Sequence, residues 1–309
     1  MKKCFKLNFI SCALLLACLL TFNSCSKEEV VEGRLIQPTL KSLTLSTGFT
    51  DNIFPIKADK WTVSYVKDAV SGELLKDAVG NIVKLDGNSE TEVGDGWLKM
   101  EKTANNELKI SLLENFSATP RNFTVGIQSG NQQDEINFRQ MRGEDYELVK
   151  KEIKEVEGSR KIYVSSEGCS SMTLGNDTGS EKNVEVLSIF KDVKYSSEFL
   201  SESYGAFDWI SSQDTMIFMD EILIDGTSYW QRTVPYTKGI TTESYIKPGN
   251  SLKLLVKPFS SVSVRGEFTY LERTCTYVFT VKNKNSGHLF NVKGTWKQKV
   301  PLTPHTIVE

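Results

Sequence analysis

Short apolar alternations broken by turn residues run through the first half of the chain from residue 40. Trp61, Val63 and Tyr65 alternate with polar neighbours. The same pattern recurs at residues 43–45, 54–56, 108–112, 123–127 and 136–138. A period of two repeated at this spacing predicts half-buried strands of an antiparallel β-sandwich.

The pattern resumes in the second half of the chain. Strands are predicted at residues 161–165, 183–190, 215–219, 221–224, 228–234, 251–257, 268–281 and 288–299. Residues 283–287 are predicted to form a hairpin loop between the last two strands. Because helices and strands do not alternate, we expect an all-β protein with two β-sandwich domains, at residues 40–141 and 160–309.

Residues 142–159 separate the two predicted domains. Ten charges fall within the sixteen residues 142–157, and the apolar residues are spaced at i, i+3, i+7 and i+10. This spacing favours a short helix, whereas the charge density also fits an extended connector. Both alternatives stay open at this point.

The first 24 residues have the layout of a secretory signal peptide. A start rich in lysine precedes residues 9–22, which carry no charge. This run is shorter than the ~20 residues that a membrane-spanning helix needs. We expect removal of residues 1–24, with residues 25–39 as a tether.

Residues 22–25 (FNSC) resemble the lipobox of bacterial lipoproteins. The resemblance implies cleavage before Cys25 and acylation of that cysteine, which anchors the chain in a membrane. The alternative is a plain signal peptide with Cys25 as a bystander. Residues 25–29 (CSKEE) also resemble the acidic tag of surface lipoproteins of Bacteroidetes, which implies an outer-membrane, cell-surface location.

The first predicted domain resembles the BACON family, an immunoglobulin-like β module of Bacteroidetes proteins. The resemblance rests on Trp61, Trp97, the run Asn115-Phe116-Ser117, Arg121 and a closing strand that ends in Gln140. It implies glycan capture, or spacing of another domain from the membrane, without firm ligand residues. Both tryptophans are expected in the core, and Asn115 and Arg121 are expected to bond around a turn.

The composition and the motifs limit the functions that we expect of this chain. The net charge of −2 and pI near 5.9 give no basic excess, so we expect no nucleic-acid partner. No metal motif, phosphate loop or nucleophile motif is present, so no metal, cofactor or catalytic residue is assigned and an enzyme is not expected. Asn176-Asp177 is a weak alternative for Ca²⁺.

Cys169 and Cys275 are the cysteines that follow Cys25. A disulfide between them would close a loop of about 105 residues, worth on the order of 4–5 kcal/mol in a chain-entropy view. Two buried free thiols are the alternative.

An aromatic cluster is the strongest candidate for binding. Tyr204, Phe207 and Trp209 fall with Asp208 in a loop rich in Gly, Ser and Asp, and Trp230 follows in a predicted strand. Exposed rings beside a carboxylate would suit a glycan. The alternative is that the rings fold inward and cap the sandwich.

These patterns predict a lipid-anchored cell-surface accessory protein that binds glycans without catalysis or supports their uptake. Its expected partners are a glycan, the membrane through Cys25, and surface proteins. The alternative function is a structural or adhesive lipoprotein whose domains act as spacers or protein-contact modules.

Overall fold

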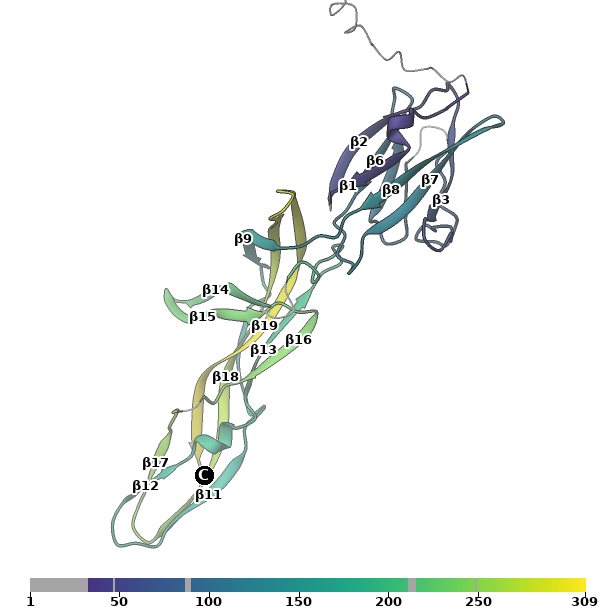
Figure 1. Ribbon diagram of the computed structural model, residues 1–309. Helices are drawn as coiled ribbons and strands as arrows, with labels where there is room; N and C mark the ends of the chain where they lie inside the picture. The colour runs from purple at the N-terminus through teal and green to yellow at the C-terminus, as the bar shows by residue number, and fades with distance from the viewer. Residues whose placement is uncertain (1–32, 47, 87–89, 211–214, 248) are drawn as a thin grey trace, which may run out of the picture.

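The computed structural model describes residues 33–46, 48–86, 90–210, 215–247 and 249–309. These residues form an all-β protein, as predicted (Figure 1). The helical segments that they contain are the short 3-10 turns η1 (Pro38–Leu40) and η2 (Leu187–Phe190). None of the helices in these ranges is long and apolar enough to cross a membrane. The predicted signal peptide and Cys25 lie outside the described residues.

The first domain is a β-sandwich of two four-stranded sheets. One sheet has the order β1 (Ser42–Leu45), β8 (Gln132–Gln140), β7 (Arg121–Ser129) and β3 (Thr62–Asp68). The other has the order β2 (Phe49–Pro55), β6 (Glu107–Leu112), β5 (Leu98–Lys102) and β4 (Glu90–Glu92). All pairs are antiparallel except β1 with β8.

The core of this domain consists of the inward positions of the alternating strands. Trp61 and Trp97 are buried in it, as expected. Leu35 and Ile36 are also buried in this core, and the Leu35 carbonyl accepts a hydrogen bond from the Lys57 amide. The tether predicted to run to residue 39 therefore ends earlier, because these two apolar residues join the sandwich.

The second domain is built on one long hairpin of β18 (Ser260–Asn283) and β19 (Leu289–Val308). One side of β18 pairs with β9 (Tyr146–Glu155), β10 (Lys161–Ser165) and β11 (Ser171–Asn176). On the far side of β19 lie β13 (Lys194–Leu200) and β16 (Gly239–Ser244). Two small two-stranded sheets complete the domain: β14 (Met216–Ile224) with β15 (Thr227–Pro235), and β12 (Lys182–Glu185) with β17 (Lys253–Val256).

The connector predicted over residues 142–159 is largely a strand of the second sheet, so its helical alternative is wrong. β9 pairs with β18 along its length, with an irregularity that leaves Val149 without a register partner. The extra residue of a bulge shifts by one the positions that face the core. Leu148 and Ile153 therefore both pack against the core although they are five positions apart. Val149 and Val156, which completed the apparent helical stripe, are exposed and do not join the core.

The predicted strands of the second domain are mostly confirmed, with three additions. β11, β13 and β16 were not predicted, and residues 187–190 form η2 instead of a strand. β18 and β19 are also longer than predicted, because the residues before Phe268 continue to pair with residues 305–308. The hairpin loop after Asn283 is present as expected.

The two domains follow each other along one axis (Figure 1). The first domain, which carries the N-terminal part of the described chain, lies at one end of the molecule. The strands β11, β12 and β17 lie at the opposite end. We call the turns at this far end, residues 177–181 and 257–260, the distal tip.

Candidate functional site

The aromatic loop lies where the two domains meet, and its rings are packed rather than displayed. Tyr204 is half-buried, and its Oη accepts a hydrogen bond of 2.6 Å from Arg121 of the first domain. Its ring also lies 5.9 Å from the ring of Phe116, another first-domain residue. Tyr204 is therefore a contact between the domains.

Phe207 and Trp209 pack onto Tyr236, a fully buried residue that follows β15. Trp209 is only 6% exposed, whereas Asp208 between these two rings is exposed. Trp230 is 7% exposed and stacks on Tyr195. The rings thus fold inward, as the alternative interpretation had it, and they do not form an exposed platform.

Glu114 forms the centre of the contact between the domains, which we call the domain seam. It follows β6 of the first domain and is 2% exposed. Its carboxylate accepts hydrogen bonds from Tyr146 Oη (3.0 Å), Asn283 Nδ2 (3.3 Å) and His288 Nδ1 (2.8 Å). Burial, and then the charge of Glu114, raises the pKa of Tyr146. Because all three donors belong to the second domain, separating the domains would break all three hydrogen bonds to this carboxylate.

The neighbouring turn at Asn115 shapes the first-domain side of the seam. The fully buried Asn115 Nδ2 donates to the carbonyl of Thr119 (3.0 Å), and its Oδ1 accepts from the amide and hydroxyl of Ser117. This turn presents Phe116 to Tyr146, Tyr204 and Phe290 of the second domain. The expectation that Asn115 bonds around a turn is confirmed.

Arg121 differs from its expected role in a backbone turn. Its guanidinium lies 4.3 Å from the Trp97 ring centroid and donates to Gln140 Oε1 (2.8 Å) as well as to Tyr204. Two of the motif residues that carried the family resemblance, Phe116 and Arg121, therefore contact the second domain. Pattern reasoning missed this because the aromatic acceptor lies 83 positions away in the chain.

Two adjoining hollows open beside the seam. One, of about 510 Å³, lies between β9 and β14, and the other, of about 640 Å³, lies beside Arg142 and Lys284. Both are lined by Tyr146, Trp209 and Ile210. Asp208 lines the second hollow, so two of the predicted ligand-binding residues, Asp208 and Trp209, lie there together. Tyr204, Phe207 and Trp230 line neither hollow.

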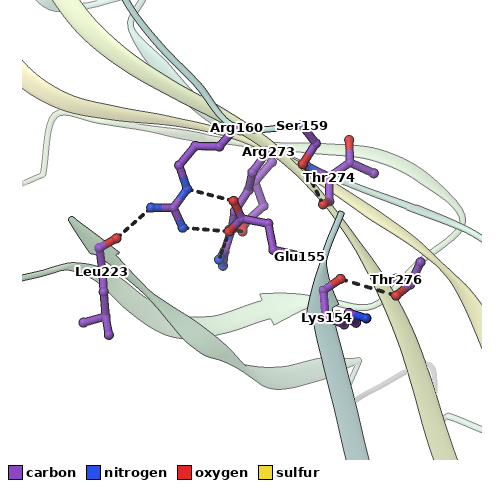
Figure 2. Close-up of polar contacts among 9 residues, drawn as sticks. Lys154, Glu155, Ser159, Arg160, Leu223, Arg273, Thr274 and Thr276 are labelled. Atoms are coloured by element: carbon purple, nitrogen blue, oxygen red, sulfur yellow. Dashed lines mark hydrogen bonds and ion pairs between the residues drawn. The ribbon is translucent and has the colours of Figure 1, made fainter. Parts of the chain in front are cut away.

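A charged cluster around Glu155 holds the β14–β15 hairpin against the sheet. Figure 2 shows Glu155 between Arg160 and Arg273, with ion pairs of 2.7 and 3.2 Å. The hydrogen bond from Arg160 holds the pKa of Glu155 below its usual range. Arg160 also donates to the Leu223 carbonyl of the hairpin (2.7 Å). A carboxylate committed to two arginines in this way is a structural clamp.

No disulfide joins Cys169 and Cys275, so the predicted disulfide is wrong for this structure. A Cβ on Gly266 would lie 3.1 Å from Cys169 Cβ, which places Cys169 beside that part of β18. Cys275 lies nine residues further along the same strand, or roughly 30 Å at about 3.3 Å per residue. Bridged cysteines need Cα atoms within about 7 Å of each other.

The described residues contain no group of three or more His, Cys, Asp or Glu side chains placed to hold a metal ion. The weak Ca²⁺ alternative at Asn176-Asp177 gains nothing from the geometry. Both polar atoms of the Asn176 amide are already used in hydrogen bonds within the protein.

Comparisons with known proteins assign no family. No family model and no curated protein matches the chain. A solved protein from Bacteroides thetaiotaomicron is similar over 34% of this chain and 80% of its own, at 24% identity and a TM-score of 0.26. A lamprey immune protein is similar over 85% of this chain and 92% of its own, at 10% identity and a TM-score of 0.36.

The parasporin-2 toxin of Bacillus thuringiensis is similar over 62% of this chain and 75% of its own, at 12% identity. Its TM-score is 0.24. At these scores, none of the likenesses carries a function over to the present chain.

Proposed function

We propose that this chain is a lipid-anchored cell-surface protein in which the first domain acts as a spacer and presents the second domain away from the membrane. The observation that carries the proposal is the domain seam. A buried carboxylate with three donors, and an aromatic contact around Phe116, join the domains end to end. The lipobox at Cys25 and the resemblance to BACON modules are part of the same proposal.

Small-angle X-ray scattering of the full-length protein in detergent tests the stiffness of this rod. We expect the protein part of the scattering to fit a single extended particle. Glu114→Ala removes the carboxylate that accepts hydrogen bonds from three second-domain residues, so the scattering of this variant should require a range of domain orientations. Glu101→Ala, which removes a partly exposed carboxylate on β5, is the control. A wild-type protein that already samples many orientations would refute the spacer role.

The anchor is tested separately by metabolic labelling with a palmitate analogue. Incorporation into the wild-type chain and its loss in Cys25→Ala are expected. Proteolysis of intact cells should then remove the protein from the surface. An unlabelled wild-type chain would contradict the anchor, and complete protection from protease would contradict the surface location.

Glycan binding is the second candidate function, and the hollows beside Trp209 favour it. Tyr146, Trp209 and Ile210 give both hollows an apolar lining. The exposed side chains of Asp208 and Lys284 line one of the two hollows. Apolar rings with a carboxylate and an ammonium group nearby suit the C–H face and the hydroxyl groups of a sugar.

A glycan array probed with wild-type protein and with Asp208→Asn tests this candidate. Asp192→Asn is the control, because Asp192 is exposed and lines neither hollow. We expect a glycan signal that weakens in Asp208→Asn alone. A signal that is equal in all three proteins would place the binding outside these hollows.

A further inference from the structure

The distal tip displays one aromatic ring. Phe259 is 77% exposed, compared with 50% for Phe218 on β14 and 48% for Tyr229 on β15. It lies in the turn between β17 and β18, at the end of the molecule farthest from the first domain (Figure 1). No sequence pattern singled it out, because a lone Phe after a Pro in a turn is not a recognisable motif.

The backbone at Phe259 is in the left-handed region, with φ of 50°. This conformation is disfavoured for residues with a Cβ and is rare for aromatic residues. A chain keeps such a residue only where the surroundings impose the conformation. The ring is thus held outward by the fold, at a cost in stability.

Asn176 imposes this conformation. It is 2% exposed, and its Nδ2 donates to the carbonyls of Ser180 (2.8 Å), Val256 (3.0 Å) and Lys257 (3.0 Å). Its Oδ1 accepts from the amide and hydroxyl of Thr178. The Phe259 amide in turn donates to the Thr178 carbonyl. One buried amide therefore fixes both loops of the tip and with them the position of the ring.

The same device occurs in the domain seam, where it supports a contact. Asn115 bonds the residues two and four positions ahead just as Asn176 does, and its Nδ2 also reaches the carbonyl of the incoming strand at Gln140. At the seam, the second domain covers the neighbouring Phe116. At the tip, the described chain leaves Phe259 largely open to solvent.

The polar groups near Phe259 indicate the class of ligand. The hydroxyls of Thr178 and Ser260 are spent within the loops. The side chains of Asp177 and Lys257 have no hydrogen bond or ion pair within the described structure and are exposed. Together with Glu181, and with Lys182 directly beyond the tip in β12, these residues make two acids and two lysines, so this end of the molecule selects for neither anions nor cations.

The small size of the tip narrows the class further. Two short loops offer far fewer side chains than the about 20–30 residues per partner of a standard protein interface. One ring without a basic excess is also too little for a stable hold on a membrane. A single sugar ring has a matching footprint, with an apolar C–H face for the Phe ring and hydroxyls for a carboxylate and an ammonium group.

We infer that the distal tip binds a neutral sugar ring stacked on Phe259, with Asp177 and Lys257 contacting its hydroxyls. This inference rests on the proposed function, because the spacer role places the tip outward, away from the membrane. A contact of one ring is weak by itself. Many anchored copies acting together on a polysaccharide give it strength.

The test uses full-length protein in detergent on an array of neutral oligosaccharides displayed at high density. Phe259→Ala is compared with Phe218→Ala, which removes another exposed ring from the same domain. We expect at least a tenfold loss of signal in Phe259→Ala and less than a twofold change in Phe218→Ala. Asp177→Asn and Lys257→Met should each lower the signal about threefold. Circular dichroism establishes that each variant is folded.

Three outcomes would overturn the inference. Signal kept in Phe259→Ala, or no signal for any neutral sugar, removes the proposed ligand or its site. Dimerisation of the wild type that disappears in Phe259→Ala would assign the ring to contact between two copies. Each result is separate from the scattering test, so the tip site can fail while the spacer role stands, and the reverse.

Discussion

Two asparagine turns, one in the first domain at the domain seam and one at the distal tip of the second domain, share one hydrogen-bond pattern and lie in opposite surroundings. Asn115 and Asn176 each accept from the amide and hydroxyl two residues ahead, and each donates to the carbonyl four residues ahead. The first turn is enclosed in the domain seam, and the second stands at the distal tip. The same hydrogen bonds therefore give a rigid turn in both places. The difference is that the second domain covers the turn at the seam, whereas solvent surrounds the turn at the tip.

The aromatic residues make the same contrast. At the seam, four pairs of aromatic rings have centroids within 6 Å of each other. These pairs join Phe116 to Tyr146, Tyr204 and Phe290, and Tyr146 to Phe290. At the tip, Phe259 lies over Gly179, where an added Cβ would stand 3.7 Å from the ring. A cluster of aromatic residues in a sequence thus marks an internal contact here, and the isolated ring is the exposed one.

The largest effect is expected from adding one methyl group to the seam. A Cβ at Gly143 would overlap Tyr146 Oη, which Glu114 and Phe116 hold in place. Gly143→Ala should lower the free energy of unfolding by about 3 kcal/mol in urea titrations, as overpacking does. Gly175→Ala on β11 is the control, because its Cβ meets open space. Equal stability of the two variants would show that the seam is loosely packed.

The two asparagine turns provide a matched pair of substitutions. Asn115→Ala and Asn176→Ala each leave buried backbone carbonyls without donors, which costs about 2 kcal/mol. Urea unfolding should register a similar loss in both variants. Only Asn115→Ala should also loosen the domains in scattering. Loosening by Asn176→Ala instead would contradict the separate roles of the two turns.

Much of the fold was predictable from the sequence, because alternation directly reports which face of a strand is buried. Trp61 and the strand at residues 161–165 are where the pattern puts them. β9 was ambiguous because the bulge at Val149 breaks the period of two. β11 and β16 were missed since their outward faces are polar or small and their inward faces carry few apolar residues.

The candidate site was less predictable, since the sequence does not reveal long-range partners. Glu114 gave no signal, because a lone acid after a strand is ordinary until Tyr146 and His288 are known to face it. One usable signal was present, namely the recurrence of Asn-x-Ser/Thr-x-Ser/Thr at 115–119 and 176–180. The second copy begins with Asn176, whose side chain holds the two loops of the tip together, although the motif does not point to Phe259 itself.

Acid should weaken the β12–β17 pair of the second domain, whereas alkali should weaken the domain seam. The Glu185 carboxylate accepts a hydrogen bond from the Leu252 amide at the end of the β12–β17 pair that faces away from the distal tip, and this hydrogen bond lowers the pKa of Glu185. Its contribution is full above the ordinary glutamate pKa and is lost as the pH falls below it. The pKa of Tyr146 is raised, so the seam keeps its contribution up to about pH 10 and loses it at higher pH.

Urea unfolding across this pH range checks the two signs. The advantage of wild type over Glu185→Gln should shrink on acidification below pH 4.5, the usual glutamate value. Tyr146→Phe should be less sensitive than wild type to alkali above pH 10, the usual tyrosine value. A wild type and a Glu185→Gln variant that lose stability in parallel on acidification would remove Glu185 from this account.

The smallest expected effect is a gain in the free energy of unfolding, whereas the substitutions above lower it. Asn tolerates the left-handed backbone that Phe259 adopts, so Phe259→Asn should raise the free energy of unfolding by about 0.5–1 kcal/mol. Phe218→Asn, an equally polar change on β14, should be neutral or destabilising because asparagine is disfavoured in strands. Thermal and urea unfolding of both variants measure the difference. A tip that grows more stable when its ring is removed is one in which the ring serves contact rather than folding, whereas a destabilised Phe259→Asn would make the ring part of the packing of the tip.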